Sequence, residues 1–140
     1  MKYQQGDIIE INFLFPNGEF KPHPALIISN DYLQEVEEGY IYLVLITSKN
    51  YNEEFSYPLT DEMLSFKMSK QSYVKCHIIS GNTTRDILRK IGYIKRPYFE
   101  EIKKKVINEY GKNKIFYRDT MGSIFFCNAS PNQSYRPEKR

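Results

Sequence analysis

The chain has 140 residues, of which 41% are hydrophobic and 15% aromatic, which is enough apolar material for the core of one domain. Its 20 basic and 17 acidic residues leave a net charge of +3, too small to bind nucleic acid through an overall field, so any such site has to be local. The two cysteines, Cys76 and Cys127, lack CxxC spacing, which argues against a disulfide framework or a zinc site and fits a reducing cytosol.

Two strands and an intervening loop are predicted in the first 30 residues. The turn signal Gly6-Asp7 precedes an alternating segment, residues 8–15, that is typical of a strand with one buried face. Residues 19–24 are predicted as a loop because Pro22 and Pro24 exclude a helix there. Residues 25–29 form a short, unbroken apolar run, which predicts a strand buried on both faces.

Three more strands are predicted in the middle of the chain. Residues 40–47 are rich in β-forming side chains, and the polar end of this segment delivers hydroxyls and a cation where a strand stops. Residues 55–59 predict a short strand, and residues 72–79 alternate again. About five strands separated by turn signals indicate a small barrel.

One clear helix is predicted near the C-terminus. Residues 97–110 place apolar side chains at a spacing of three to four, with Pro97 in the first turn and Gly111 as the stop. Before it, residues 83–92 predict one helical turn or more that ends at Gly92. After it, residues 115–117 and 123–127 predict a hairpin, and residues 130–140 a disordered polar tail.

Several of these segments, taken in order, carry a family resemblance. They are Gly6-Asp7-Ile8, residues 24–31 with the sequence PALIISND, residues 45–48 with LITS, and residues 72–92 ending in LRKIG. Together with the helix they resemble a MazF/PemK-type toxin over residues 4–110. The resemblance implies a mainly β (α+β) fold, a small SH3-like barrel closed by a C-terminal helix. We expect residues 1–111 to form this domain and residues 112–140 to be an extension that packs on it, adds an edge strand or covers a partner interface.

The resemblance also implies a function. Members of this family are endoribonuclease toxins of type II toxin-antitoxin systems, which form homodimers and are neutralised by an antitoxin protein. The implied substrate is single-stranded RNA, in which a ribose 2′-hydroxyl attacks the adjacent phosphate without a metal or other cofactor. The chain shows no signal peptide and no run near the ~20 apolar residues of a membrane span, so we expect a cytoplasmic protein without membrane partners.

Two residues are the predicted catalytic pair. Thr47 matches a threonine of the family at the end of the third strand, and His23 stands where the family has an arginine before a proline. An imidazole with an ordinary pKa of ~6.5 can give or take a proton near neutrality, which a guanidinium hardly can. A second expected arginine is replaced by Ser80.

Five residues are predicted to bind the substrate. Lys21 and Lys49 flank the catalytic pair and would attract phosphates, and Ser48 adjoins Thr47. His77 could be a second titrating group beside Lys75, and Ser80 occupies the second arginine position. Each also has a plainer interpretation as a solvated lysine, a strand hydroxyl or a satisfied core histidine.

The two missing arginines favour a second hypothesis. A barrel of this fold that has lost catalysis would bind RNA or a protein without cutting RNA. A third class, a toxin that poisons a topoisomerase, has no support in the sequence. The sequence leaves open which RNA sequence is cut and which antitoxin binds.

Overall fold

The computed structural model describes residues 3–50, 52–112, 114–118 and 124–128, with side chains described as far as residue 109. The strands are β1 (Asp7–Leu14), β2 (Phe20–Ile27), β3 (Tyr40–Thr47), β4 (Ser56–Pro58), β5 (Tyr73–Lys75), β6 (Ile78–Thr83), β7 (Ile87–Tyr93), β8 (Lys114–Arg118) and β9 (Ile124–Asn128). The helices are α1 (Asp31–Val36) and α2 (Arg96–Lys112), with 3-10 turns η1 (Asp61–Met63) and η2 (Thr84–Asp86).

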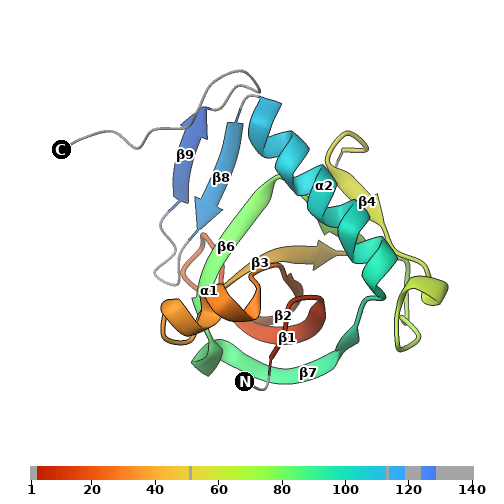
Figure 1. Cartoon of the computed structure of the whole chain (residues 1–140), viewed down its shortest axis with the longest axis horizontal. Coiled ribbons are helices and arrows are strands. Elements are labelled where there is room, and N and C mark those ends of the chain that lie inside the picture. Colours follow the sequence, from red (N-terminus) through yellow and green to blue (C-terminus); the bar gives the residue numbers. More distant parts are fainter. Residues whose placement is uncertain (1–2, 51, 113, 119–123, 129–140) are drawn as a thin grey trace.

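The strands form one curved sheet in the order β7-β1-β2-β3-β6-β8-β9, with β5 paired to β3 and β4 paired to β5. All neighbours are antiparallel except β6 and β8, which run parallel. Figure 1 shows the central strands curving around the interior, with α2 lying across one side. The expected mainly β fold with a C-terminal helix is confirmed. Among the described residues no ladder joins β9 back to β7, so the barrel is open.

The sheet buries apolar side chains on both faces, because alternate residues of a strand point to opposite sides. On one face Ile8, Leu26 and Val44 pack with Phe99 and Ile102 of α2. The other face carries a second core, made of Ile9, Ile11, Phe13, Ala25, Ile27, Ile41, Leu43 and Leu45. Strands β1, β2 and β3 each contribute side chains to both cores.

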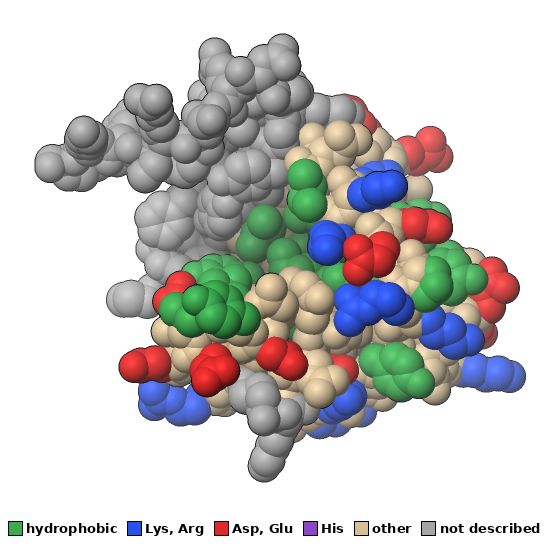
Figure 2. Space-filling model, in the orientation of Figure 1, with side chains coloured by type: hydrophobic (Ala, Val, Ile, Leu, Met, Phe, Trp, Pro, Cys, Tyr) green, Lys and Arg blue, Asp and Glu red, His purple; other side chains and the backbone are tan. Residues whose placement is uncertain are grey.

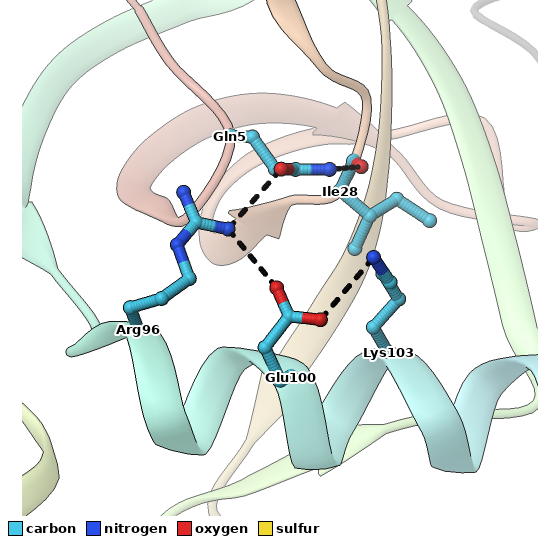
Figure 3. A network of polar contacts seen from close by, with 5 residues as sticks. All are labelled: Gln5, Ile28, Arg96, Glu100 and Lys103. Carbon is cyan, nitrogen blue, oxygen red and sulfur yellow. Dashed lines mark hydrogen bonds and ion pairs between the residues drawn. The ribbon is translucent and has the colours of Figure 1, made fainter.

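A polar network fixes the first turns of α2 to the sheet (Figure 3). The amide of Gln5 donates to the carbonyl oxygen of Ile28 at 2.9 Å and accepts from the guanidinium of Arg96 at 3.2 Å. Arg96 also pairs with Glu100 at 3.4 Å, and Glu100 pairs with Lys103 at 3.2 Å. These exposed ion pairs orient the helix and add little stability by themselves.

The predicted loop over residues 19–24 is wrong, because β2 runs through it. Pro22 lies opposite Asn12 and Pro24 opposite Glu10 in the ladder with β1. The ladder between β2 and β3 begins only at Ala25, so the prolines lie before the part of β2 that pairs with β3. Proline lacks an N–H, and these positions tolerate this because no ladder bond to β3 requires the donor.

The single strand predicted over residues 72–79 is also wrong, since the segment forms β5 and β6 with a turn between them. Both parts pair with β3, but Val74 lies opposite Ile46 and Ser80 opposite Leu43. The segment that contains β5 and β6 therefore has more residues than the matching stretch of β3. The extra residues form a turn at Cys76 and His77.

Residues 83–92, predicted as one helical turn or more, contain only a short helical part in the structure. Only η2 is helical, closed by a capping box between Thr83 and Asp86, and β7 follows it. The apolar residues of β7 complete the sheet against β1, a tertiary contact that overrides the local capping signal. Helix α1, which has no counterpart among the predicted elements, is capped by Asn30, whose side chain accepts from the amide of Leu33.

The segment after α2 forms two strands, β8 and β9, which pair antiparallel as the predicted hairpin does. Strand β8 also pairs in parallel with β6, at the edge of the sheet. The predicted tail over residues 130–140 lies outside the described residues. In the part of the chain that the structure describes, no helix is long and apolar enough to cross a membrane.

Candidate functional site across β2, β3 and β5

Four side chains share one face of the sheet where β2, β3 and β5 meet. Ala25 lies opposite Leu45 in the β2–β3 ladder, and continuing this register by two residues sets His23 opposite Thr47. Across the other edge of β3, Thr47 lies directly opposite Tyr73. Opposed residues of an antiparallel pair, and residues two apart on one strand, project from the same face. We call this group the strand-end cluster: His23, Thr47, Tyr73 and Lys75.

The imidazole of His23 lies at the edge of the second core. Its ring centroid is 6.4 Å from that of Phe13 and 5.5 Å from that of Phe15. Burial and, next, the charge of Lys75 lower the pKa of His23, and a hydrogen bond to the backbone of Ile46 partly offsets this. A lowered pKa favours the neutral imidazole, and a neutral imidazole held against the residue before Thr47 is suited to accept a proton.

The hydroxyl of Thr47 has one defined partner. Its oxygen accepts from the backbone amide of Lys49 at 3.2 Å, which tightens the turn after β3. Because a hydroxyl both accepts and donates, this bond leaves its proton for another acceptor. Ser48 and Lys49 are exposed in the same turn. Both therefore lie beside Thr47 and are open to solvent.

His77 lies in the turn between β5 and β6. Its ring lies against that of Phe55, tilted by 38° with 3.5 Å between the centroids, and its Nδ1 is buried with no hydrogen-bond partner in the described structure. Burial and then the charge of Lys75 lower the pKa of His77 to about 4. The charge of Lys75 thus acts on both histidines of the chain.

Lys21 adjoins His23, and Ser80 does not. Lys21 is two residues before His23 on β2, and its ammonium lies 6.0 Å from the ring centroid of Phe15, a neighbour of the imidazole. Ser80, in contrast, is fully buried on β6, and its hydroxyl donates to Asn82 at 2.8 Å. The structure therefore places Lys21 near His23, and Ser48 and Lys49 beside Thr47, whereas His77 is linked to this group through Lys75 and Ser80 lies apart from it.

Sequence reasoning left Tyr73 and Lys75 out of the predicted site. Tyr73 belongs to it through its pairing with Thr47, and Lys75 through its place two residues further along β5. The alternation of residues 73–75 was visible in the sequence, but their pairing with β3 was not.

No group of three or more His, Cys, Asp or Glu side chains among the described residues could hold a metal ion.

A groove of about 340 Å³ adjoins the cluster from the opposite face of the sheet. Pro24 and Ile46, neighbours of His23 and Thr47, form part of its wall, and Lys67, Lys70 and Arg89 also line it. By contrast, the described part of the face that carries α1 and α2 mixes acidic and basic side chains and shows no histidine (Figure 2).

Comparisons with solved structures give three similar folds. The Mycobacterium tuberculosis toxin MazF-mt6 matches with a TM-score of 0.59 and 17% identity, covering 74% of this chain and 95% of that one. A MazE-MazF structure from Deinococcus radiodurans matches at 0.62 and 16%, covering 77% and 95%. A mycobacterial endoribonuclease in complex with its cognate antitoxin matches at 0.62 and 13%, covering 79% and 96%. At these identities the similarity establishes the fold alone.

The comparison with curated protein sequences gave no significant match. The model of the family described as PemK-like, MazF-like toxin of type II toxin-antitoxin system, however, matches residues 4–109. This range contains β1 to β7, nearly all of α2 and the whole strand-end cluster. The chain therefore belongs to the PemK-like, MazF-like toxins of type II toxin-antitoxin systems.

Proposed function

We propose that this toxin is an endoribonuclease that cuts single-stranded RNA without a metal or other cofactor. The observation that carries the proposal is the shared face of His23, in the middle of β2, and Thr47, at the end of β3, which the continued β2–β3 register sets opposite one another. Cleavage by an internal nucleophile needs a base, an acid and donors for developing charge, and imidazoles and hydroxyls serve in those roles.

In the proposed reaction, the neutral imidazole of His23 accepts the proton of a ribose 2′-hydroxyl. The 2′-oxygen then bonds to phosphorus while the bond to the 5′-oxygen breaks, and the 5′-oxygen takes a proton from a second acid, leaving a 2′,3′-cyclic phosphate and a 5′-hydroxyl. Thr47 donates its proton in a hydrogen bond to a non-bridging phosphate oxygen. Lys21, Ser48 and Lys49 border the same face and bind the neighbouring phosphates, so binding weakens as salt rises.

The proposed partner is an antitoxin protein, acting in the cytoplasm on a homodimer of this chain. The similar structures include one described as an endoribonuclease in complex with its cognate antitoxin, and others described as MazE-MazF. An acidic antitoxin segment would compete with RNA for Lys21 and Lys49. Purified toxin should therefore lose RNA binding when its antitoxin is added.

The proposal is tested by incubating the full chain with a long single-stranded RNA in EDTA. We expect fragments that carry 5′-hydroxyl ends, and at least about 100-fold slower cleavage by the His23→Gln variant. Lys104→Met, which removes an exposed lysine of α2, is the matched control and should cut like the wild type. Intact RNA at every pH from about 5 to 8, the range in which histidines titrate, would refute the proposal.

A second candidate function is a binding module of the same fold that no longer cuts RNA. Histidine and serine at positions 23 and 80, where the family resemblance leads us to expect arginines, favour it, as does the burial of Ser80. This candidate predicts that RNA or a protein partner binds while every phosphodiester stays intact. The cleavage assay, run beside a filter-binding assay, separates the two candidates.

We also propose that residues 1–111 are the toxin unit and residues 112–140 an appended extension. A chain that ends at Gly111 loses the strand that pairs in parallel with β6. An exposed β6 edge invites pairing between chains, so the truncated protein should form larger oligomers in size-exclusion chromatography. An unchanged elution volume would mean that the extension is dispensable for assembly.

A further inference from the structure

Lys75 occupies a central place among the chemically active side chains of this toxin. It ends β5 opposite Ser56 of β4 and is half-buried. It follows Val74, which pairs with Ile46, the residue whose backbone bonds to His23. The topology therefore brings Lys75 near the end of β3 and the middle of β2, on the face that carries the strand-end cluster.

His77, which follows Lys75 in the turn after β5, is the second imidazole near this ammonium. The turn that begins after Lys75 carries the second imidazole two residues along the chain, where Phe55 supports one face of its ring. Both imidazoles lie close enough to the ammonium for its charge to lower their pKa values. These are the two histidines of the whole chain, so one cation lies within electrostatic reach of every imidazole that the protein has.

We propose that Lys75 binds the phosphate that is to be cleaved and that His77 is the second proton-transfer group, paired across this phosphate with His23. The inference rests on the proposed ribonuclease function and deepens it. One ammonium and two imidazoles supply a cation, a base and an acid, which is the full set that metal-free phosphodiester cleavage requires. The set also takes the place of the two arginines that the chain lacks at positions 23 and 80.

These three groups account for both proton transfers of the proposed reaction. One neutral imidazole takes the proton of the 2′-hydroxyl as the new bond to phosphorus forms. The other imidazole, protonated, gives its proton to the 5′-oxygen as that bond breaks, and the ammonium of Lys75 binds a non-bridging oxygen throughout. Burial and, after it, the charge of Lys75 favour the neutral form of both rings in the free protein, whereas a bound phosphate anion favours protonation of one of them.

Nuclear magnetic resonance of the two imidazoles tests the anion site without any need for catalysis. Inorganic phosphate is titrated into the wild type, Lys75→Met, Lys75→Arg and the surface control Lys104→Met. We expect phosphate to shift both imidazole resonances of the wild type, with an affinity that falls about tenfold or more in Lys75→Met. The Arg variant and the surface control should keep the affinity. Unshifted wild-type resonances, or equal affinities of the two Met variants, would overturn the inference.

The cleavage assay supplies the second test. Lys75→Met and His77→Gln should each lower kcat about 100-fold or more, with Lys75→Arg recovering part of the loss. Wild-type kcat in His77→Gln would overturn the role of the second imidazole. A wild type that binds phosphate at these imidazoles yet cuts no RNA would refute the ribonuclease proposal while supporting the anion site, so the two failures are distinguishable.

Discussion

The pKa of His77 makes a quantitative prediction about how folding stability depends on pH. This pKa lies at about 4 in the folded protein, against 6.5 for an ordinary histidine. At 1.36 kcal/mol per unit, the full difference is worth about 3 kcal/mol. Because the ring is only half-buried, solvent screening reduces the expected effect to about 1–2 kcal/mol.

The sign follows from which state binds the proton first. Above pH 6.5 the imidazole is neutral in both states, and its contribution to stability is fully present. As the pH falls, the unfolded chain takes up a proton before the folded chain does, which favours unfolding. The contribution is lost progressively between pH 6.5 and about 4.

His77→Phe is the perturbation that isolates this effect, because it keeps a ring on Phe55 and removes the titrating nitrogens. Urea unfolding of this variant and of the wild type is followed by circular dichroism between about pH 7.5 and 5. Over this range the free energy of unfolding of the variant should fall by about 1–2 kcal/mol less than that of the wild type. His23 and the carboxylates are common to both proteins, so their contributions cancel in the difference. Parallel curves for the two proteins across this range would refute the reasoning.

Three further predictions concern the cores and Lys75. Phe99 is fully buried between α2 and the sheet, so Phe99→Ala should lower the free energy of unfolding by about 3–5 kcal/mol in urea, and a loss below about 1 would contradict this packing. A Cβ on Gly92 would lie 2.5 Å from the ring of Phe66, so Gly92→Ala should destabilise the protein, and less in a Phe66→Ala background. Additivity in that double-mutant cycle would refute the contact. Lys75→Met should raise the pKa of both imidazoles in an NMR titration, and unchanged values would remove Lys75 from their surroundings.

Much of the fold followed from local patterns in the sequence. The alternation of residues 8–15 and the β-rich run of residues 40–47 correspond to β1 and β3, and the three-to-four spacing after Pro97 corresponds to α2. These signals are reliable because each records how one element buries one face. The order of the motifs also pointed to the toxin family whose model matches residues 4–109.

Where local signals competed with strand pairing, the sequence predicted the wrong element. The prolines of residues 19–24 suggest a loop, yet they fit β2 because the ladder between β2 and β3 begins only at Ala25. The capping signal at Thr83 is satisfied by η2 alone, after which β7 pairs with β1. An edge position and a sheet partner are properties of the assembled molecule, and no window of sequence contains them.

The sequence by itself determined the residue types of the candidate site, since His23 in a predicted loop, Thr47 at the end of a predicted strand and His77 within another stand out as titratable or hydroxyl groups. Only the tertiary structure decided which of them meet. Pairing of β5 with β3 brings Lys75 to this group, and burial on β6 keeps Ser80 away from it. The reason is physical: a residue's type and local pattern are written along the chain, whereas proximity across strands depends on register, which forms only when the whole sheet packs.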